Sequence, residues 1–522
     1  MSESDSAAGG SPSAPRGAAR LRNEFLHRDH TRGSLLASVL VLAAPAVLTS
    51  FGLALFQLFD LRFLGQISDE AVAAAGATNQ TLRQIFQVSA FGLSVAVQML
   101  IAKSVGGRRI DEADHIAGQS FLLTGVLAVV AVLSVGLFPR FFVSFVVHES
   151  AVPMAAVYAQ ITFAFFAFNM FTQAANGILV GSGDATTPMV IGFIQIPVAI
   201  FFEWALAFGK LGLPELGVAG IAYGTVIGGS CSFSLALWAL FSGRSRVHVR
   251  RRHLRPDWSA LRGITRTSWQ PALQMIARSA MIMVFMYLAG TIGSHVQAAY
   301  TIGLRIEMIA VMIAFPIANA CATVVGQNLG AGDDRRAWRA VLVSAAVEVS
   351  ILWPGAVLLY FFRDAAVAIF TSDPIVAAEA SEYLRYVSFI LAWWGIYFVA
   401  FRTLQAAGDM ITPMLISLVL AVGLGTPLAV YLSGRPDFGA SGMWIANAVY
   451  SVVNTILMVG WLLTGRWTRR GASVASRCPA RPDRSLPGGP PIRTAKREGR
   501  TTARGKAFFV AYRGAWCGRA PR

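Results

Sequence analysis

Long apolar runs recur along the chain at intervals of roughly 30 residues, and each is close to the ~20 residues that a helix needs to cross a bilayer. The stretches between them are short and rich in glycine, proline and charged residues. This pattern predicts twelve membrane-spanning helices, six in each half of the chain. The predicted spans cover residues 35–64, 72–101, 116–138, 152–179, 188–208, 217–241, 267–289, 297–325, 338–361, 379–405, 412–432 and 440–464.

One short phrase occurs once in each half. The pattern Gly-Asp-x-x-Thr-Pro-Met begins at Gly183 and again at Gly408, 225 residues later. In both copies the Thr-Pro pair stands where a span begins, because proline's missing N–H costs nothing in the first turn of a helix. Gly106 and Gly330 keep nearly the same offset. We therefore expect a duplicated six-span unit whose halves are parallel repeats about an axis along the membrane normal.

The composition supports an all-α membrane protein. The 522 residues are 55% hydrophobic and 14% charged, with a mean hydropathy of +0.57, whereas a soluble protein carries about 25% charged residues. A transmembrane β-barrel would show short alternating segments instead of long apolar runs. A soluble fold and a barrel are therefore both disfavoured.

The net charge of +17 is concentrated in one segment. Residues 465–522 contain fifteen Lys or Arg and two acids, so they contribute +13. Because this segment is also rich in Pro, Gly, Ser and Thr, we expect a disordered tail that is simply solvated or touches anionic lipid headgroups, and no nucleic-acid partner. The expected organisation is a polar disordered N-terminus at 1–33, a six-helix lobe at 34–241, a cytoplasmic linker at 242–264, a second lobe at 265–464 and the basic tail at 465–522.

Basic residues predict the orientation. Arg108, Arg109, Arg335 and Arg336 and the linker lie on one side of the predicted bundle, whereas the opposite loops hold few basic residues. Because basic loops stay in the cytoplasm, we expect both termini to be cytoplasmic, in a cell inner or plasma membrane. The N-terminal residues show no apolar core followed by a cleavage site, so we expect the first span to be an uncleaved anchor.

A second phrase, Val-Gly-Gln-Asn-Leu-Gly-Ala-Gly-Asp at 325–333, follows the eighth span. Together with the paired Gly-Asp loops it resembles the multidrug and toxic compound extrusion (MATE) transporters, over roughly 34–465, and within them the bacterial DinF-like branch. The resemblance implies a V-shaped, two-lobed bundle that exports amphipathic, often cationic, organic compounds in exchange for protons or sodium. The phrases themselves are tight glycine-rich turns, so they identify the scaffold and not the substrate site.

Ionisable groups inside a span are costly and are therefore functional candidates. Asp60 lies in the first span with Gln57 three residues before it, a spacing that places both on one helix face, which we expect to face the protein interior. Glu203 and Thr225 come at a similar depth, and all three lie roughly 8 to 12 Å below the outer boundary at about 1.5 Å per residue. They are the first candidates for an ion-coupling site.

The family resemblance implies that a span-one Asp, a span-five Asn and Asp, and a span-six Thr line a cation or proton site in the N-terminal lobe. Asp60, Glu203 and Thr225 match these in kind, but Ala199 occupies the Asn position. Losing that amide weakens a sodium site more than a proton site, because a hard cation needs several oxygen ligands. We therefore favour H⁺ over Na⁺ as the coupling ion. Since Asp60 and Glu203 both belong to the first half, we expect one coupling lobe.

The second half departs further from the family pattern. Arg278 stands where several MATE branches carry a span-seven Glu, and residues 388–404 contain no acid. Arg278 and Glu307 come at similar estimated depths, so we expect a buried ion pair. Whether this pair is structural or contacts substrate stays open.

Polar and aromatic positions predict a cavity. Amide side chains recur at helical spacing in spans two and four, and aromatic residues of the tenth span suit flat cations through stacking and cation–π contact, although such residues also pack between helices. The weaker candidates for a substrate cavity are Gln57, Gln84, Gln173, Asn176, Trp394 and Tyr397.

The leading prediction is a monomeric secondary antiporter for small organic cations, with no cofactor. A major-facilitator transporter also has parallel six-span halves, but 106–109 lacks the acidic and basic loop expected of it. A flippase for lipid-linked oligosaccharides shares the architecture and would need more basic residues in its cavity. A membrane enzyme is weakest, because the histidines show no metal-ligand spacing; they include His148, His248, His253 and His295.

Overall fold

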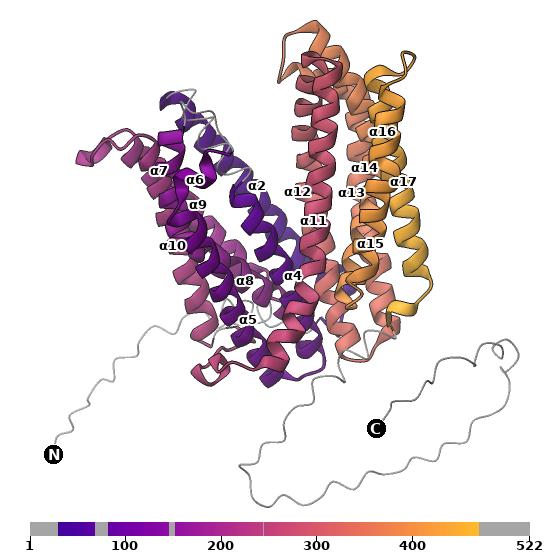
Figure 1. Ribbon diagram of the computed structural model, residues 1–522. Helices are drawn as coiled ribbons and strands as arrows, with labels where there is room; N and C mark the ends of the chain where they lie inside the picture. The colour runs from indigo at the N-terminus through magenta and orange to yellow at the C-terminus, as the bar shows by residue number, and fades with distance from the viewer. Residues whose placement is uncertain (1–29, 68–81, 146–151, 244, 469–522) are drawn as a thin grey trace, which may run out of the picture. The chain divides into compact units, whose positions relative to one another are not determined.

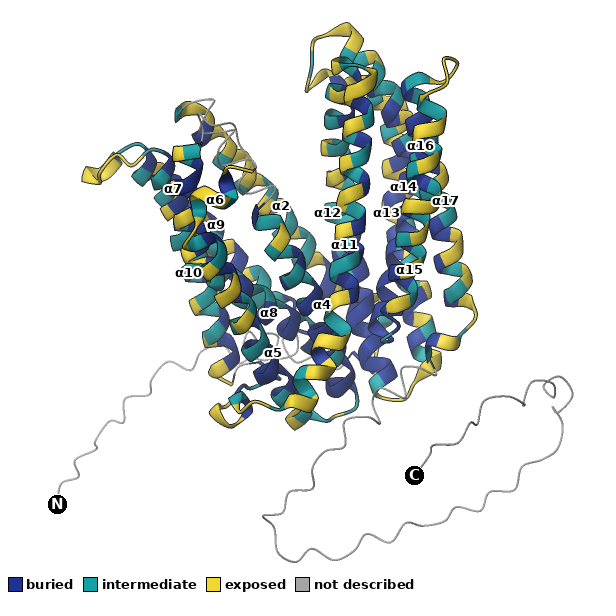
Figure 2. Ribbon diagram, in the orientation of Figure 1, coloured by how far each residue is buried: buried dark blue, intermediate teal, exposed yellow. Residues whose placement is uncertain are grey.

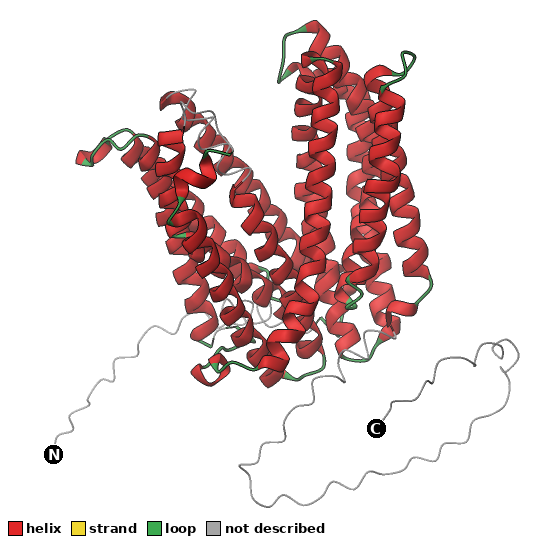
Figure 3. Cartoon of the chain, viewed as in Figure 1, coloured by secondary structure: helices red, strands yellow, loops and turns green. Residues whose placement is uncertain are grey.

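The structure, a computed structural model, describes residues 30–67, 82–145, 152–243 and 245–468. Within these residues it consists of helices and the loops between them, with no strand (Figure 3). The start of the predicted second span at 72–81, most of the N-terminal segment at 1–33 and most of the basic tail at 465–522 lie outside the described residues.

The N-terminal half contains six spans, two of which are interrupted (Figure 1). The third continues through a π-helical turn, and the fourth consists of two helices that meet at 47°. In chain order the elements are α2 (Leu35–Ile67), α4 (Gln84–Gly106), α5 (Ile110–Ala131), η2 (Val132–Gly136), α6 (Pro139–Val143), α7 (Val152–Ala164), α8 (Phe166–Ser182), α9 (Thr186–Ala207), η4 (Lys210–Gly212) and α10 (Val218–Phe241).

The C-terminal half repeats the arrangement with longer helices. A short 3-10 turn, η5 (Arg251–Leu254), precedes it. Its helices are α11 (Trp258–Ile292), α12 (Ser294–Gly330), α13 (Asp334–Ala368), α14 (Pro374–Ala406), α15 (Ile411–Leu420), η6 (Ala421–Gly425), α16 (Thr426–Ser433) and α17 (Gly439–Leu463).

In the described part of the chain, eleven helical segments are long and apolar enough to span a membrane, and the bent pair α7–α8 brings the number to twelve. The predicted all-helical fold of two six-span halves is confirmed. Helix α11 begins at Trp258, about two turns before the apolar run predicted from 267, because the Asp257 side chain accepts a hydrogen bond from Ser259 N at 2.9 Å and caps the helix. Apolar runs locate spans, but they miss the polar turns that extend them.

The two Gly-Asp loops have the same local structure. Gly183 ends α8 with φ of 97°, a left-handed conformation that favours glycine, and the Asp184 side chain accepts a hydrogen bond from Thr187 N at 2.9 Å. Gly408, with φ of 86°, and Asp409 repeat both roles in the second copy. The helices that follow begin at the predicted Thr-Pro pairs, because each aspartate satisfies free backbone donors of the first turn.

Helices α4 and α12 cross at the end of the bundle that carries these loops, here called the motif end. A Cβ atom on Gly106 would lie 1.9 Å from the Gln327 carbonyl oxygen, and one on Gly330 would lie 2.1 Å from the Lys103 carbonyl oxygen. Glycine is thus required at both positions for the helices to touch. Figure 2 shows the buried residues gathered around α4 and the lower part of α12.

Side chains join the two halves around this crossing. Gln98 donates to Thr323 Oγ1 at 3.0 Å, and these two residues are 225 positions apart, so equivalent positions of the repeats face each other. Lys103 Nζ donates to the Ala407 carbonyl at 2.8 Å, while Gln327, its counterpart in the second half, donates to the Gly181 carbonyl at 3.2 Å. Each half therefore holds the Gly-Asp loop region of the other.

The linker between the halves folds against α5. Gln119 donates to the carbonyls of His253 and Arg255 at 2.9 and 2.7 Å, and it accepts from Asp257 N at 2.9 Å. Hydrogen bonds from Ser259 hold the pKa of Asp257 below its ordinary value. The start of α11 is thereby fixed to the N-terminal half.

Candidate functional site

Three polar side chains meet inside the N-terminal half, where α9 packs against both α2 and α10. Thr225 of α10 donates from Oγ1 to Glu203 Oε1 of α9 at 2.8 Å. Glu203 is 0% exposed, and its second oxygen, Oε2, has no hydrogen-bond partner among the described residues. Oδ1 of Asp60, on α2, is likewise buried and without a partner there. Glu203 and Thr225 are in direct contact, and each carboxylate keeps one unsatisfied buried oxygen.

Glycines bring α9 and α10 close enough to bury Glu203. A Cβ on Gly224 would lie 2.5 Å from Glu203 Cγ, and one on Gly228, a turn later, would lie 2.6 Å from Ala199 Cβ. The helices are therefore packed backbone to backbone at Ala199. A side chain at Gly228 would therefore collide with α9, and Ala199 is buried against this contact.

Two charged groups act on Asp60, one acidic and one basic. Asp60 and Glu203 lie close enough for their charges to interact, and the Arg83 guanidinium also acts on Asp60. Arg83 stands directly before α4, with its guanidinium carbon 5.8 Å from the centroid of the Phe166 ring. Sequence reasoning missed Arg83, although a scan for every ionisable residue in the predicted second span would have found it.

Several weaker candidates lie elsewhere. Gln57 is exposed on α2, whereas Asp60 is half-buried, and the role of Gln57 in a substrate cavity stays a prediction. Most of the apolar window of α2 is unburied, which leaves Gln57 on an uncovered face. Gln173 and Asn176 lie on α8, half-buried, and Asn176 Oδ1 has no partner among the described residues.

The C-terminal half contains a cavity of about 560 Å³. It lies among α11, α12, α14, α15 and α17, and α4 contributes Gln84 and Phe91. Five sequence candidates line it: Gln84, Arg278, Glu307, Trp394 and Tyr397. The cavity therefore brings together the candidates of the second half but excludes Gln57, Gln173 and Asn176.

The expected ion pair between Arg278 and Glu307 does not form. Glu307 accepts a hydrogen bond from the Tyr383 hydroxyl at 3.1 Å, and the Arg278 guanidinium carbon lies 5.2 Å from the centroid of the Trp394 ring. The two charges still act on each other across the cavity. Similar depth along two helices fixes the height of a side chain but not the direction in which it points.

Sequence reasoning missed most of the remaining lining. Tyr300 and Tyr450 add aromatic surface, Asn447 and Asn454 add amides, and α11 and α12 contribute methionines that fill irregular space. The span that holds Asn447, Tyr450 and Asn454 carried no functional candidate, and in the spans of Arg278 and Glu307 nothing in the spacing of Tyr300 or the methionines distinguished them from packing residues.

Glu348 of α13 is also buried. It is 0% exposed, and neither carboxylate oxygen has a hydrogen-bond partner in the described part of the chain. Buried acids are thus not confined to the N-terminal half. Glu348 lies within the predicted ninth span, so a systematic scan of acids in spans would have found it.

Two repeated six-helix halves, carboxylates buried inside the spans and an internal cavity define a polytopic membrane transporter. The MatE family profile matches residues 45–205 and 271–431, one match in each half. The chain belongs to the MATE family, whose members are transporters and not enzymes. Among the residues that the structure describes, no three His, Cys, Asp or Glu side chains form a group that could hold a metal.

Relatives and solved structures agree with this family. The chain is 25% identical over 450 residues to the probable multidrug resistance protein NorM of Thermotoga maritima, covering 84% of this chain and 94% of that protein. It is 23% identical to the probable multidrug resistance protein YpnP of Bacillus subtilis, covering 84% and 97%. The fold superposes on the outward-facing conformation of a multidrug resistance MATE family transporter with a TM-score of 0.77 at 22% identity, covering 86% and 98%.

Proposed function

We propose that this protein exports amphipathic organic cations in exchange for protons, with Asp60, Glu203 and Thr225 as the coupling site. One observation carries the proposal: Glu203 is completely buried, with one oxygen held by Thr225 and the other unsatisfied beside Asp60. A buried charge without partners is costly, and two carboxylates in one low-dielectric site repel. Binding a proton removes both penalties.

Proton binding and substrate export are coupled in this proposal by repacking of the N-terminal half. Protons reach the carboxylates from the outside and neutralise them. With Asp60 and Glu203 neutral, helices α2 and α9 then pack more closely, and substrate is expelled outward. Release of the protons to the cytoplasm restores the charged, substrate-accepting state. Both termini and the motif end are cytoplasmic, as the basic loops indicate.

Protons are favoured over sodium because the site is poor in neutral oxygens. A sodium ion needs several oxygen ligands, and Ala199 supplies none where the family places an amide. Ala199 is 2% exposed and lies against Gly228 of α10. Apart from the missing asparagine, this arrangement supports assignment to the DinF-like branch.

The C-terminal cavity is the proposed substrate site. Its aromatic and methionine side chains suit flat amphipathic molecules, and the names of the relatives indicate drug efflux. Among the described residues that line it, Arg278 is the single basic residue and Glu307 the single acid. A flippase that holds a pyrophosphate would need more basic residues, so the cavity favours an exporter. The proposal takes this exporter to be a monomer in a lipid bilayer.

Dye efflux from vesicles tests the proposal. Reconstituted protein is given a fluorescent cationic dye and either a pH gradient or a sodium gradient, each applied separately. We expect the pH gradient to drive transport and the sodium gradient to have no effect. Transport driven by sodium alone would contradict proton coupling, and no response to either gradient would contradict a coupled exporter.

Replacing Trp394 with Ala tests the substrate site. Removing the ring that faces Arg278 deletes a large stacking surface from the cavity, so we expect the Kd of the dye to rise about tenfold, or about 1.4 kcal/mol. Dye binding to purified protein is measured by fluorescence anisotropy. The matched control is Trp258→Ala, since Trp258 is 81% exposed at the start of α11. Equal dye affinity in both variants would place the substrate elsewhere.

A further inference from the structure

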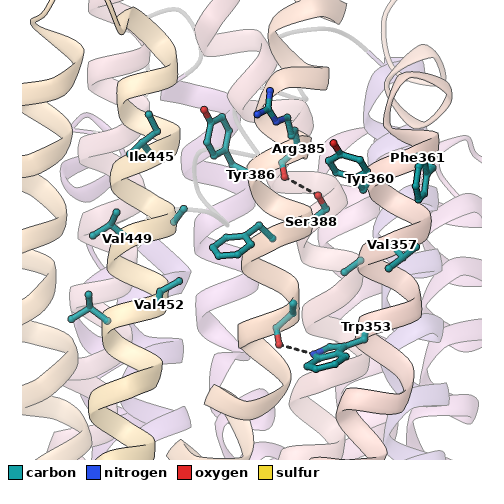
Figure 4. Close-up of a pocket in the computed structure, with 15 residues that line it drawn as sticks. Trp353, Val357, Tyr360, Phe361, Arg385, Tyr386, Ser388, Ile445, Val449 and Val452 are labelled. Atoms are coloured by element: carbon teal, nitrogen blue, oxygen red, sulfur yellow. Dashed lines mark hydrogen bonds between the residues drawn. The ribbon is translucent and has the colours of Figure 1, made fainter.

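A groove of about 870 Å³ runs along the C-terminal half between α13, α14 and α17. Its lining is almost entirely apolar, and Val357 and Phe389 in its wall are more than half exposed. Figure 4 shows Arg385 with the rings of Tyr360 and Tyr386 at one end of the groove, and Trp353 at the other. The groove therefore has a polar end at Arg385 and is apolar along the rest of its length.

Arg385 is the unneutralised charge of this groove. It is exposed, and in the described ranges no acid lies within ion-pair distance of it; its guanidinium carbon lies 5.9 Å from the centroid of the Tyr386 ring. Arg363, also at this end, differs because it pairs with Asp364 at 3.9 Å. Glu382, one turn before Arg385, accepts a hydrogen bond from Ser441 at 2.6 Å.

The position of Arg385 along α14 places it near a membrane surface. The helix has 33 residues, or about 50 Å at 1.5 Å per residue, against about 30 Å of hydrocarbon. If α14 is centred in the bilayer, Arg385 lies about 7.5 Å inside the boundary opposite the motif end, within reach of the interface for a long side chain. Tyrosine rings beside it are typical of that level.

The opposite end of the groove offers no free polar group. Trp353 Nε1 already donates to the Ala392 carbonyl at 3.0 Å, so the indole presents only its apolar surface. Along α17, Ile445 lies level with Tyr386, and Val449 and Val452 follow toward the Trp353 end (Figure 4). The groove thus matches a molecule with a negative head and an apolar chain.

We propose that this groove binds a phospholipid, with its phosphate on Arg385 between Tyr360 and Tyr386 and an acyl chain along the valines toward Trp353. The planar guanidinium fork fits two phosphate oxygens. A helix from a second copy of the chain would fill the apolar part but would bury the guanidinium without a counter-charge, which is strongly unfavourable. The groove volume is also that of a small-molecule site.

Native mass spectrometry tests this site on delipidated, full-length protein. The protein is titrated with phosphatidylglycerol, with diacylglycerol of the same chains, and with inorganic phosphate. We expect phosphatidylglycerol to bind about tenfold more tightly than either of the others, and Arg385→Gln to lose about tenfold in that affinity. Arg385→Lys should fall between the two. Arg305→Gln, which changes another exposed arginine on α12 outside the groove, should bind as the unmodified protein does.

Dye transport by Arg385→Gln verifies that this variant folds. Phosphatidylglycerol binding that is equal in Arg385→Gln and the unmodified protein would overturn the proposal, as would diacylglycerol binding as tightly as phosphatidylglycerol. Inorganic phosphate binding as tightly as the lipid would show that the acyl chain contributes nothing and would also overturn it. A dimer that dissociates in Arg385→Gln would assign the groove to a second copy of the chain.

Discussion

Dye efflux driven by a pH gradient is expected to fall to the level of empty vesicles in Asp60→Asn and in Glu203→Gln. An amide cannot release a proton, so each variant is locked in a state resembling the protonated one, while a glutamine at 203 can still accept the hydrogen bond from Thr225 Oγ1. The expected loss of rate is at least about a hundredfold, because the coupling step itself is removed. The measurement is the initial rate of efflux from proteoliposomes.

The matched control is Asp364→Asn, an acid whose side chain is 74% exposed and whose nearest basic group lies 3.9 Å away. Surface ion pairs of this kind contribute little to folding stability, so we expect the efflux rate of Asp364→Asn to equal that of the unmodified protein. Both coupling-site variants should still bind the dye, since the proposed substrate cavity lies in the other half. Full efflux by either variant would show that its carboxylate carries no transported proton.

Replacing Gly330 with Val is expected to slow transport by a different route. A Cβ at this position would lie 2.1 Å from the Lys103 carbonyl oxygen, and backbone cannot move aside as a flexible side chain can. The crossing of α4 and α12 would open, and with it the hydrogen bonds by which each half holds the other. If the proposed export cycle depends on closure of this motif end, efflux should fall at least about tenfold, the rate equivalent of about 1.4 kcal/mol.

Cys321 provides a direct readout of the crossing. It is 0% exposed on α12, near Thr323, and can be kept as the single cysteine after Cys231, Cys478 and Cys517 are changed to serine. Gly330→Val should speed the labelling of Cys321 by a thiol reagent about tenfold, because separating α4 from α12 would cost less free energy in this variant. Gly460→Val is the control, since a Cβ at Gly460 meets no atom within 4 Å. Unchanged labelling and efflux in Gly330→Val would refute the role of the crossing.

The spans were predictable because the length of an apolar run is set by the bilayer. The beginnings of α9 and α15 were predictable because proline and the capping aspartates act locally. The start of α11 was not, since Trp258 lies outside the apolar run and its helix is extended by the Asp257 cap. Local chemistry that favours a helix end can be read from sequence; polar helix extensions held by a folded linker cannot.

The candidate functional site likewise has features that the sequence predicts and features that it does not. Estimated depth placed Glu203 and Thr225 at one level, and the structure joins them by a hydrogen bond; their role in coupling remains a prediction. Similar depth wrongly predicted an ion pair between Arg278 and Glu307, because their side chains turn toward Trp394 and Tyr383. The rotation of each helix about its axis depends on packing between spans. Gly224, for example, has no side chain and so leaves room for Glu203 between α9 and α10. Such packing between distant spans has no local sequence pattern.

The central claim is that the buried carboxylates of the N-terminal half exchange protons for substrate. Proton movement driven by a dye gradient, with no pH gradient imposed, measures this exchange directly in vesicles that contain a pH indicator. We predict proton movement opposite to the dye in the unmodified protein and none in Glu203→Gln. Proton movement of equal size in both, or dye movement that carries no protons in either, would contradict the account.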